Sequence, residues 1–152
     1  MHLMDIFRYK QAELDYLRKK DKKLAAAIDR IGIIERGVDK DLFSALIGSI
    51  VSQQISNKAA EFGAMTDAEI IGRLSALPGI GVWTAEMLLI FSLERKDVLS
   101  YGDLAIRRGI CNLYGHKTIS KEQFERYRRR YSPYCSIASL YLWELSKEEK
   151  AV

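Results

Sequence analysis

Asp103 is the side chain whose place in the sequence best suits acid–base chemistry. It directly precedes the helical pattern Leu-Ala-Ile-Arg-Arg, so it lies at a predicted helix N-terminus. There the helix dipole and free backbone N–H groups favour a negatively charged carboxylate. Such a group can stabilise an oxocarbenium-like transition state at a sugar carbon and orient water. Spacing alone favours the simpler interpretation that Asp103 only caps the helix.

Upstream, the residues Leu-Pro-Gly-Ile-Gly at 77–81 predict a tight turn between two helices. Gly79 and Gly81 allow a sharp backbone turn and the close approach of a ligand. The first turn of the next helix has unpaired N–H groups, and a phosphate is the anion that this geometry suits. A bare Gly-x-Gly favours an ordinary helix–turn–helix corner. The whole string 77–85 is more specific, because its leucine and isoleucine can anchor the turn in the core.

Positive charge is concentrated after Asp103. The chain has a net charge of +4, whereas residues 105–135 alone hold eight Lys or Arg and two acidic residues. A basic region of this kind is typical of proteins that bind phosphates. A solvated helix face explains the same charges equally well, so this pattern by itself leaves both interpretations open.

Helical periodicity runs through almost the whole chain, and no alternating β-branched run is present. Helices are expected over 5–20, 22–31, 39–51, 66–76, 82–93, 103–114, 120–130 and 134–145. Capping boxes at Thr66 and Ser120 mark two of the starts. Ser132 and Pro133 predict an N-cap and a first helical residue for the last helix. The sequence therefore predicts an all-α fold.

Composition limits the class of protein. With 48% hydrophobic and 29% charged residues, the chain of 152 residues is expected to form a single compact helical domain, 1–152. No apolar run is long enough for a membrane span, and the first residues do not resemble a signal peptide. We expect an intracellular, cytoplasmic, DNA-associated protein without a membrane partner. Cys111 and Cys135 are expected to be small buried hydrophobes rather than disulfide or cluster ligands.

Four segments resemble the helix-hairpin-helix base-excision DNA glycosylases, and most closely the 3-methyladenine DNA glycosylase II branch. They are Ile-Val-Ser-Gln-Gln-Ile-Ser at 50–56, the string at 77–85, Asp-Leu-Ala-Ile-Arg-Arg-Gly at 103–109, and the Pro-Tyr…Trp pattern at 133–143. The resemblance covers about 21–145. It implies a helical bundle with the helix-hairpin-helix at about 66–93, a catalytic-type helix at about 103–114 and C-terminal helices at about 120–146.

The resemblance also implies an activity, which is release of alkylated purines such as 3-methyladenine from duplex DNA during base-excision repair of alkylation damage. Asp103 matches the catalytic aspartate, and Trp83 and Trp143 would line the pocket for the flipped base. Core packing is the alternative for both tryptophans. Because Trp83 stands where lyase-active relatives have a lysine, the enzyme is expected to be monofunctional.

The remaining matched positions concern DNA. The resemblance implies that the hairpin binds a DNA phosphate. It also implies that an earlier loop lies near the gap left by the flipped nucleotide. The hairpin residues are Gly79, Ile80, Gly81 and Thr84, and the loop residues are Gln53, Gln54 and Ile55. No side-chain metal site, iron–sulfur cluster or other cofactor is expected, beyond a monovalent cation held by hairpin carbonyls.

The chain departs from the family pattern between positions 58 and 66. Relatives have several more helices there, which form part of one subdomain and one wall of the lesion cleft. Here residues 60–65 bridge the gap directly. The alternative function is therefore a shortened helix-hairpin-helix module that binds DNA without catalysis, and exposed apolar faces left by the missing helices could favour a dimer.

Overall fold

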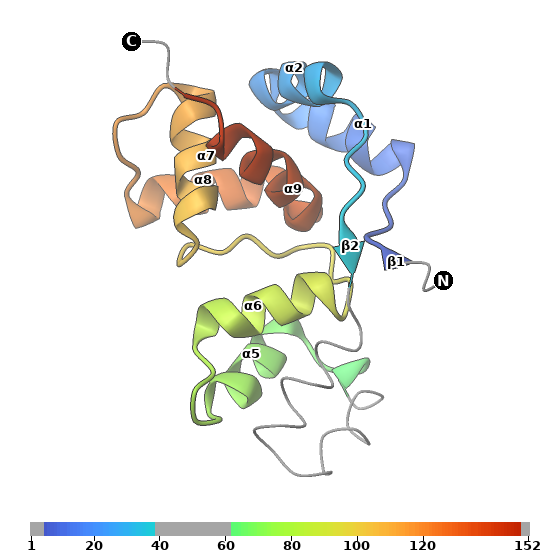
Figure 1. Cartoon of the computed structure of the whole chain (residues 1–152), viewed down its shortest axis with the longest axis vertical. Helices are drawn as coiled ribbons and strands as arrows, with labels where there is room; N and C mark the ends of the chain where they lie inside the picture. Colours follow the sequence, from blue (N-terminus) through green and yellow to red (C-terminus); the bar gives the residue numbers. More distant parts are fainter. Residues whose placement is uncertain (1–4, 39–61, 150–152) are drawn as a thin grey trace. The chain divides into compact units, whose positions relative to one another are not determined.

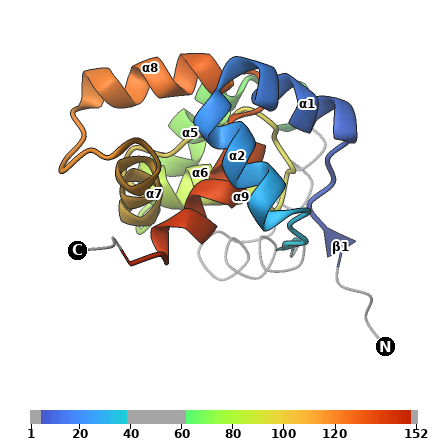
Figure 2. The same ribbon diagram turned by 90° about the horizontal axis from the view of Figure 1, so that it is seen from above.

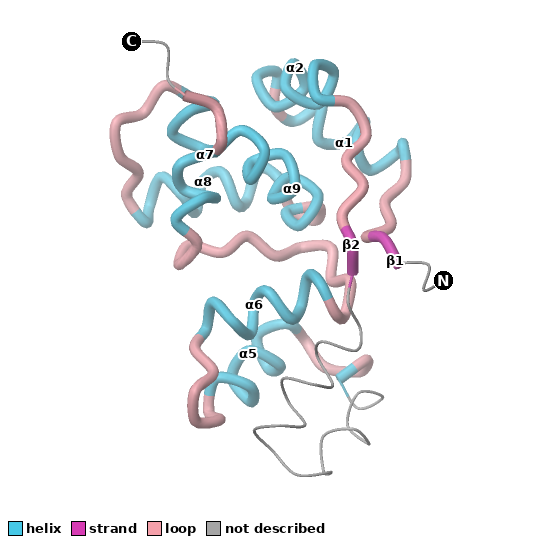
Figure 3. Tube along the Cα trace, viewed as in Figure 1, coloured by secondary structure: helices cyan, strands magenta, loops and turns pink. Residues whose placement is uncertain are grey.

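The computed structural model describes residues 5–38 and 62–149. Within these ranges it contains seven helices and one two-stranded sheet, which confirms the predicted all-α class (Figures 1 and 3). The chain divides into two compact units. One comprises Met1–Phe7 and Gly37–Arg95, and the other comprises Arg8–Arg36 and Lys96–Val152. The assignment of 1–152 to a single domain stays a prediction.

The unit formed by Arg8–Arg36 and Lys96–Val152 is built around its last helix. Its helices are α1 (Gln11–Lys20), α2 (Lys22–Ile31), α7 (Leu104–Tyr114), α8 (Lys121–Tyr131) and α9 (Cys135–Ser146). Every residue of α9 except Glu144 is buried, as expected of a helix that is apolar on all sides. Helices α2, α7 and α8 pack against it. Helix α9 is therefore the core of this unit.

The approach of α7 to α9 is closest at Gly109. A Cβ atom at this position would lie 2.1 Å from the carbonyl oxygen of Leu142 in α9. Only a residue without a side chain permits the two helices to pack at this distance.

The other unit contains a short helical pair and the small sheet. Strands β1 (Asp5–Ile6) and β2 (Gly37–Val38) pair antiparallel, and helix α5 (Asp67–Ser75) packs against α6 (Val82–Phe91). The buried side chains of the helical pair are Ile70, Leu74, Ala85, Leu88, Leu89 and Ile90. After α6, Arg95 donates to the carbonyl oxygen of Phe62 at 2.7 Å and pairs with Asp67 at 3.3 Å. These contacts hold the two ends of the hairpin together.

Local signals in the sequence predicted several helix starts correctly. Helix α2 has the predicted bounds. The side chain of Thr66 accepts a hydrogen bond from the N–H of Glu69 at 3.2 Å, and that of Ser120 accepts one from Gln123 at 3.2 Å. Both capping boxes are therefore confirmed, and Asp103 caps α7 as expected.

The helix predicted over 5–20 is wrong in its first part. Helix α1 begins at Gln11, whereas Asp5 pairs with Val38 in the sheet. Further on, Tyr9 Oη accepts the N–H of Ile34 at 2.7 Å and donates to its carbonyl oxygen at 2.8 Å. These long-range contacts hold the segment extended, and tertiary contacts of this kind override helical periodicity.

The predicted start of the last helix is also wrong. Its N-cap residue is Tyr134, and Ser132 instead follows the end of α8. The hydroxyl group of Ser132 donates to the Asp97 carboxylate at 2.6 Å, so it does not cap α9. The N–H of Ser136 is instead paired with the carbonyl oxygen of Lys96 at 2.9 Å.

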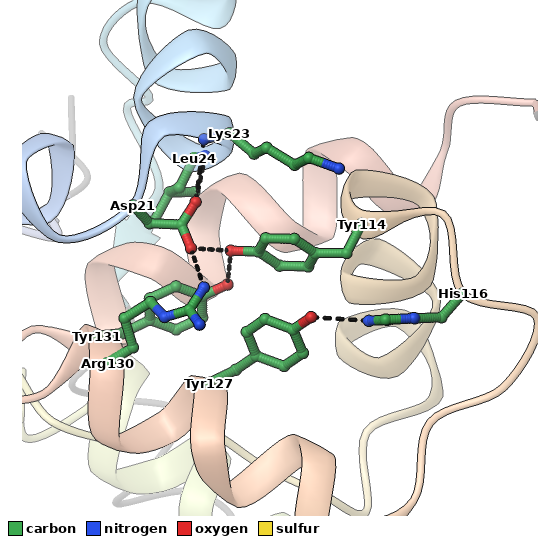
Figure 4. A network of polar contacts seen from close by, with 8 residues as sticks. All are labelled: Asp21, Lys23, Leu24, Tyr114, His116, Tyr127, Arg130 and Tyr131. Atoms are coloured by element: carbon green, nitrogen blue, oxygen red, sulfur yellow. Dashed lines mark hydrogen bonds and ion pairs between the residues drawn. The ribbon is translucent and has the colours of Figure 1, made fainter.

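A buried carboxylate joins three helices at the junction of α1 and α2. Asp21, only 5% exposed, accepts the N–H groups of Lys23 and Leu24 at 3.0 and 2.9 Å. Its other oxygen accepts the Tyr114 hydroxyl at 2.6 Å and the Arg130 guanidinium at 2.7 Å (Figure 4). Burial opposes the charged form, but these hydrogen bonds outweigh it and lower the pKa of Asp21 below its ordinary value.

This lowered pKa predicts how stability depends on pH. A carboxyl group with a lower pKa in the folded state stabilises the fold above its unfolded pKa of about 3.9, and that contribution is lost as pH falls through the folded pKa. Asp21→Asn keeps a helix-capping oxygen but loses the charge, so it is expected to lower the free energy of unfolding at pH 7 by about 2 kcal/mol.

Urea denaturation at neutral and acidic pH measures this effect. The difference between Asp21→Asn and the wild type should shrink as pH falls below about 4. Asp29→Asn is the matched control, because Asp29 is exposed on the same helix and pairs with Arg18 at 2.9 Å. It is expected to change stability by less than about 1 kcal/mol. Equal losses in the two variants would contradict the role given to Asp21.

Candidate active site

At its two glycines, the hairpin turn has the backbone geometry of an anion-binding site. Gly79 has φ +82°, a conformation that other residues rarely adopt, whereas Gly81 has an ordinary φ of −86°. Among the described residues, a Cβ atom on Gly81 would have no atom within 4 Å apart from its own chain neighbours. The fold therefore requires glycine at 79, and the free space beside Gly81 is open to a ligand that approaches the backbone.

Gly81 is also the N-cap of α6, and it has no side chain to bond the first-turn N–H groups. These groups lie at the positive end of the helix, where an anion is stabilised. Ile80 is buried and anchors the turn as predicted, whereas Leu77 is only half-buried and Thr84 lies in the first turn, also half-buried. The predicted phosphate-binding residues thus form one continuous segment, and their contact with DNA stays a prediction.

Trp83 follows in the first turn of α6, with 49% of its surface exposed. Core packing, the alternative for this tryptophan, is therefore wrong. A half-exposed indole at a helix start can offer an aromatic face to a ligand.

In the other unit, the Asp103 carboxylate is held by two donors. Oδ1 accepts the N–H of Ile106 at 3.0 Å, which caps α7. Oδ2 accepts the indole N–H of Trp143, from α9, at 3.3 Å. The aspartate is 7% exposed, but the next residue, Leu104, is 68% exposed, so the carboxylate lies just beneath the surface where α7 begins. Two donors from two helices fix the orientation of this carboxylate.

Trp143 is buried, with 8% of its surface exposed, and the guanidinium of Arg36 lies 5.7 Å from the centre of its ring. This distance is within the range of a cation–π interaction. Trp143 thus contacts Asp103 at its indole nitrogen and Arg36 near its ring. Its role as a wall of the base pocket stays a prediction. Sequence analysis did not identify Arg36, because no nearby sequence pattern marks this residue as a partner of Trp143.

The two tryptophans predicted for one pocket therefore lie in different units and in different environments. The structure brings together Asp103 and Trp143 in one unit, and Gly79, Ile80 and Gly81 with Trp83 in the other. The predicted gap residues Gln53, Gln54 and Ile55 lie outside the described residues.

Among the described residues, no three His, Cys, Asp or Glu side chains lie close enough together to hold a metal ion. Cys111 and Cys135 are free thiols, and both are buried as predicted. In the same ranges, none of the helices combines the length and apolar character needed to cross a bilayer.

Known proteins with related sequences and folds are named DNA-3-methyladenine glycosylases or glycosidases. The DNA-3-methyladenine glycosylase 1 of Schizosaccharomyces pombe is 36% identical over 108 residues, which are 70% of this chain and 47% of that protein. A DNA-3-methyladenine glycosidase structure from Bacillus halodurans gives a TM-score of 0.76 at 26% identity, covering 95% of this chain and 93% of that one. The sequence and fold of the chain fit a base-excision DNA glycosylase family.

A second structure supports the same fold for this chain. It is an S. pombe 3-methyladenine DNA glycosylase in complex with abasic DNA, with a TM-score of 0.74 at 24% identity, covering 93% of this chain and 100% of that one. No family model matches the chain. The chain spans about half the length of the curated relatives it matches. The predicted loss of helices between 58 and 66 stays a prediction, because much of that region lies outside the described residues.

Proposed function

We propose that the chain is a monofunctional DNA glycosylase that hydrolyses the N-glycosidic bond of alkylated purines, such as 3-methyladenine, in duplex DNA. The observation that carries the proposal is the Asp103 carboxylate, fixed by Ile106 and Trp143 at the start of α7. The resemblance in sequence puts Asp103 where helix-hairpin-helix glycosylases have their catalytic aspartate, and related proteins are named DNA-3-methyladenine glycosylase or glycosidase.

In this reaction, Asp103 would face the deoxyribose of a nucleotide flipped out of the duplex. The bond from C1′ to the base breaks with its electron pair on the base, and positive charge develops on the sugar. The carboxylate stabilises that charge and orients the water that adds to C1′. The products are the free base and an abasic site.

An alkylated purine is a good leaving group, because it carries positive charge while bound to the sugar and leaves as a neutral base. The half-exposed indole of Trp83 would attract such a cation to its face. Since position 83 holds tryptophan rather than lysine, no amine is present there to form an imine and cleave the strand.

The hairpin would position the duplex rather than read its sequence. The first-turn N–H groups of α6 would bind one backbone phosphate, with Gly81 allowing its close approach. The proposed partner is therefore double-stranded DNA, and the protein would be DNA-associated.

The two hairpin glycines give a test of this phosphate contact. Gly81→Ala introduces no clash with the described residues, so its free energy of unfolding should fall by less than about 1 kcal/mol. Its affinity for duplex DNA should fall about tenfold, because the methyl group meets the phosphate. Fluorescence anisotropy with undamaged duplex measures the affinity, and urea denaturation measures the stability.

Gly79→Ala is the companion variant for stability, since Gly79 belongs to the same proposed phosphate-binding segment. Its positive φ strains any other residue, so we expect a stability loss of about 1–2 kcal/mol. If Gly81→Ala bound duplex as tightly as the wild type, the hairpin would not be a phosphate contact.

A shortened module that binds DNA without catalysis is the alternative, and the names of the related proteins do not favour it. An assay of base release distinguishes the two. Alkylated duplex is incubated with the protein, and abasic sites are converted to strand breaks by heat or alkali and counted on a gel. The glycosylase proposal expects breaks that depend on the protein. Tight binding of duplex without any base release would support the alternative.

A further inference from the structure

A second cationic surface lies in the unit that does not contain the hairpin, where the end of α1, the start of α2 and the end of α8 meet at Asp21. Figure 2 shows the end of α8 beside the α1–α2 junction, and the Arg130–Asp21 ion pair at 2.7 Å joins them. We call it the corner surface. Its exposed cations are Lys19, Lys20, Lys22, Lys23, Arg126, Arg129 and Arg130.

Acidic residues neutralise little of this charge. Asp21 is buried, and among the corner cations only Arg130 pairs with it. The nearby carboxylates of Asp15, Asp29 and Glu125 pair with arginines outside the corner set. In the described part of the chain, Lys19, Lys22, Arg126 and Arg129 form no ion pair. The corner surface therefore has a strong net positive charge.

Tyrosine rings lie beside three of the cations, and Figure 4 shows two of these cations, Lys23 and Arg130. The ammonium group of Lys20 lies 5.2 Å from the ring centre of Tyr16, and that of Lys23 lies 5.9 Å from the ring of Tyr114. The guanidinium of Arg130 lies 5.2 Å from the ring of Tyr127. Cations that are already ordered lose less conformational entropy when they bind an anion.

The rings themselves are fixed by one another. Tyr127 stacks on Tyr114 with ring centres 4.2 Å apart, and its hydroxyl is hydrogen-bonded to His116 at 2.7 Å. Tyr114 is also bonded to Tyr131 at 2.6 Å, and burial raises the pKa of the Tyr114 hydroxyl group far above its usual value. The aromatic groups thus serve as a rigid support for the cations rather than as free faces for stacking bases.

The lysines at the start of α2 oppose the helix dipole. Lys22 and Lys23 occupy the first two positions of α2, and the first turn contains no acidic residue. Cations at the positive end of a helix are unfavourable by a few tenths of a kcal/mol each. The Asp21 carboxylate, which caps the N-terminus of α2, offsets part of this cost.

We infer that the corner surface binds the sugar–phosphate backbone of duplex DNA, as a contact separate from the hairpin. The large apolar residues exposed in the described chain are Ile6, Ile33, Val82, Trp83 and Leu104. Since none of them belongs to α1, α2 or α8, an anionic membrane is a poorer partner. The cations over the tyrosines leave little room for stacked single-stranded bases. A dense and regular line of phosphates suits ordered, unpaired cations.

The inference rests on the proposed function only in taking DNA as the partner, and it does not require base release. The test compares the double variant Lys22→Gln/Arg129→Gln with the wild type. Neither side chain bonds Asp21, so thermal unfolding should be unchanged. Binding of a short undamaged duplex is measured by fluorescence anisotropy between about 50 and 200 mM KCl. Loss of two phosphate contacts should reduce the slope of log K against log salt by about 1.8.

The matched control is Lys10→Gln/Lys147→Gln, which removes two exposed lysines elsewhere on the same unit. Its slope should equal that of the wild type. An unchanged slope in the corner variant, or an equal reduction in the control, overturns the inference. Binding of poly-glutamate, but not of duplex, through these residues overturns it as well. A Gly81→Ala variant that binds normally, beside a weakened corner variant, refutes only the hairpin contact of the proposed function.

Discussion

Asp103→Asn is expected to lower the rate of base release from alkylated duplex by at least about 100-fold while leaving duplex binding unchanged. Asparagine has nearly the same shape as aspartate and can still accept the N–H of Ile106, so α7 keeps its cap. It has no negative charge, and the proposed mechanism depends on that charge beside the sugar. Single-turnover base release, developed with alkali on a gel, measures the effect.

Trp143→Phe is the companion variant that tests whether the carboxylate must be oriented. It removes the indole N–H that bonds Oδ2 of Asp103 but keeps the charge. A loss of about tenfold is expected, which corresponds to about 1.4 kcal/mol of orientation energy. Full activity in Asp103→Asn would refute the catalytic role of Asp103. Loss of activity in Trp143→Phe with wild-type duplex affinity would distinguish a positioning role from a loss of DNA binding.

The parts of the fold predicted correctly are those whose signals are local. The capping boxes at Thr66 and Ser120 lie within four residues of the bonds they form, so periodicity and residue type are sufficient to predict them. The strand at Asp5 depends on a partner at Val38, and nothing in the first residues reveals that partner. The helix predicted from residue 5 was wrong for this reason.

In the candidate site, too, the sequence predicted the features that depend on local signals and not those that depend on long-range contacts. Asp103 could be named from its place before a helix, because capping is local. Its bond to Trp143 spans 40 residues and depends on how α9 packs on α7, which the sequence pattern does not specify. The exposure of Trp83 and the burial of Trp143 likewise follow from tertiary packing. Asp21 was not singled out, because its side-chain partners Tyr114 and Arg130 lie 93 and 109 residues away in the sequence.

Gly109→Ala is expected to lower the free energy of unfolding by more than about 3 kcal/mol, although alanine is the better helix former by about 1 kcal/mol. The new Cβ would lie 2.1 Å from the carbonyl oxygen of Leu142 and 3.0 Å from its Cα. These are backbone atoms, which cannot move aside as a flexible side chain can. Helix α9 would have to shift away from α7.

Gly72→Ala is the matched control for this prediction. Gly72 lies inside α5, and in the described part of the chain a Cβ there would meet no atom outside its own helical turn within 4 Å. Helix propensity then acts alone and should stabilise the protein by about 0.5–1 kcal/mol, so the two alanine variants should shift the urea midpoint in opposite directions. Because Leu142 precedes Trp143, any shift of α9 also moves the indole that orients Asp103. Folded Gly109→Ala protein should therefore release bases more slowly than the wild type, and wild-type activity with wild-type stability would contradict this packing.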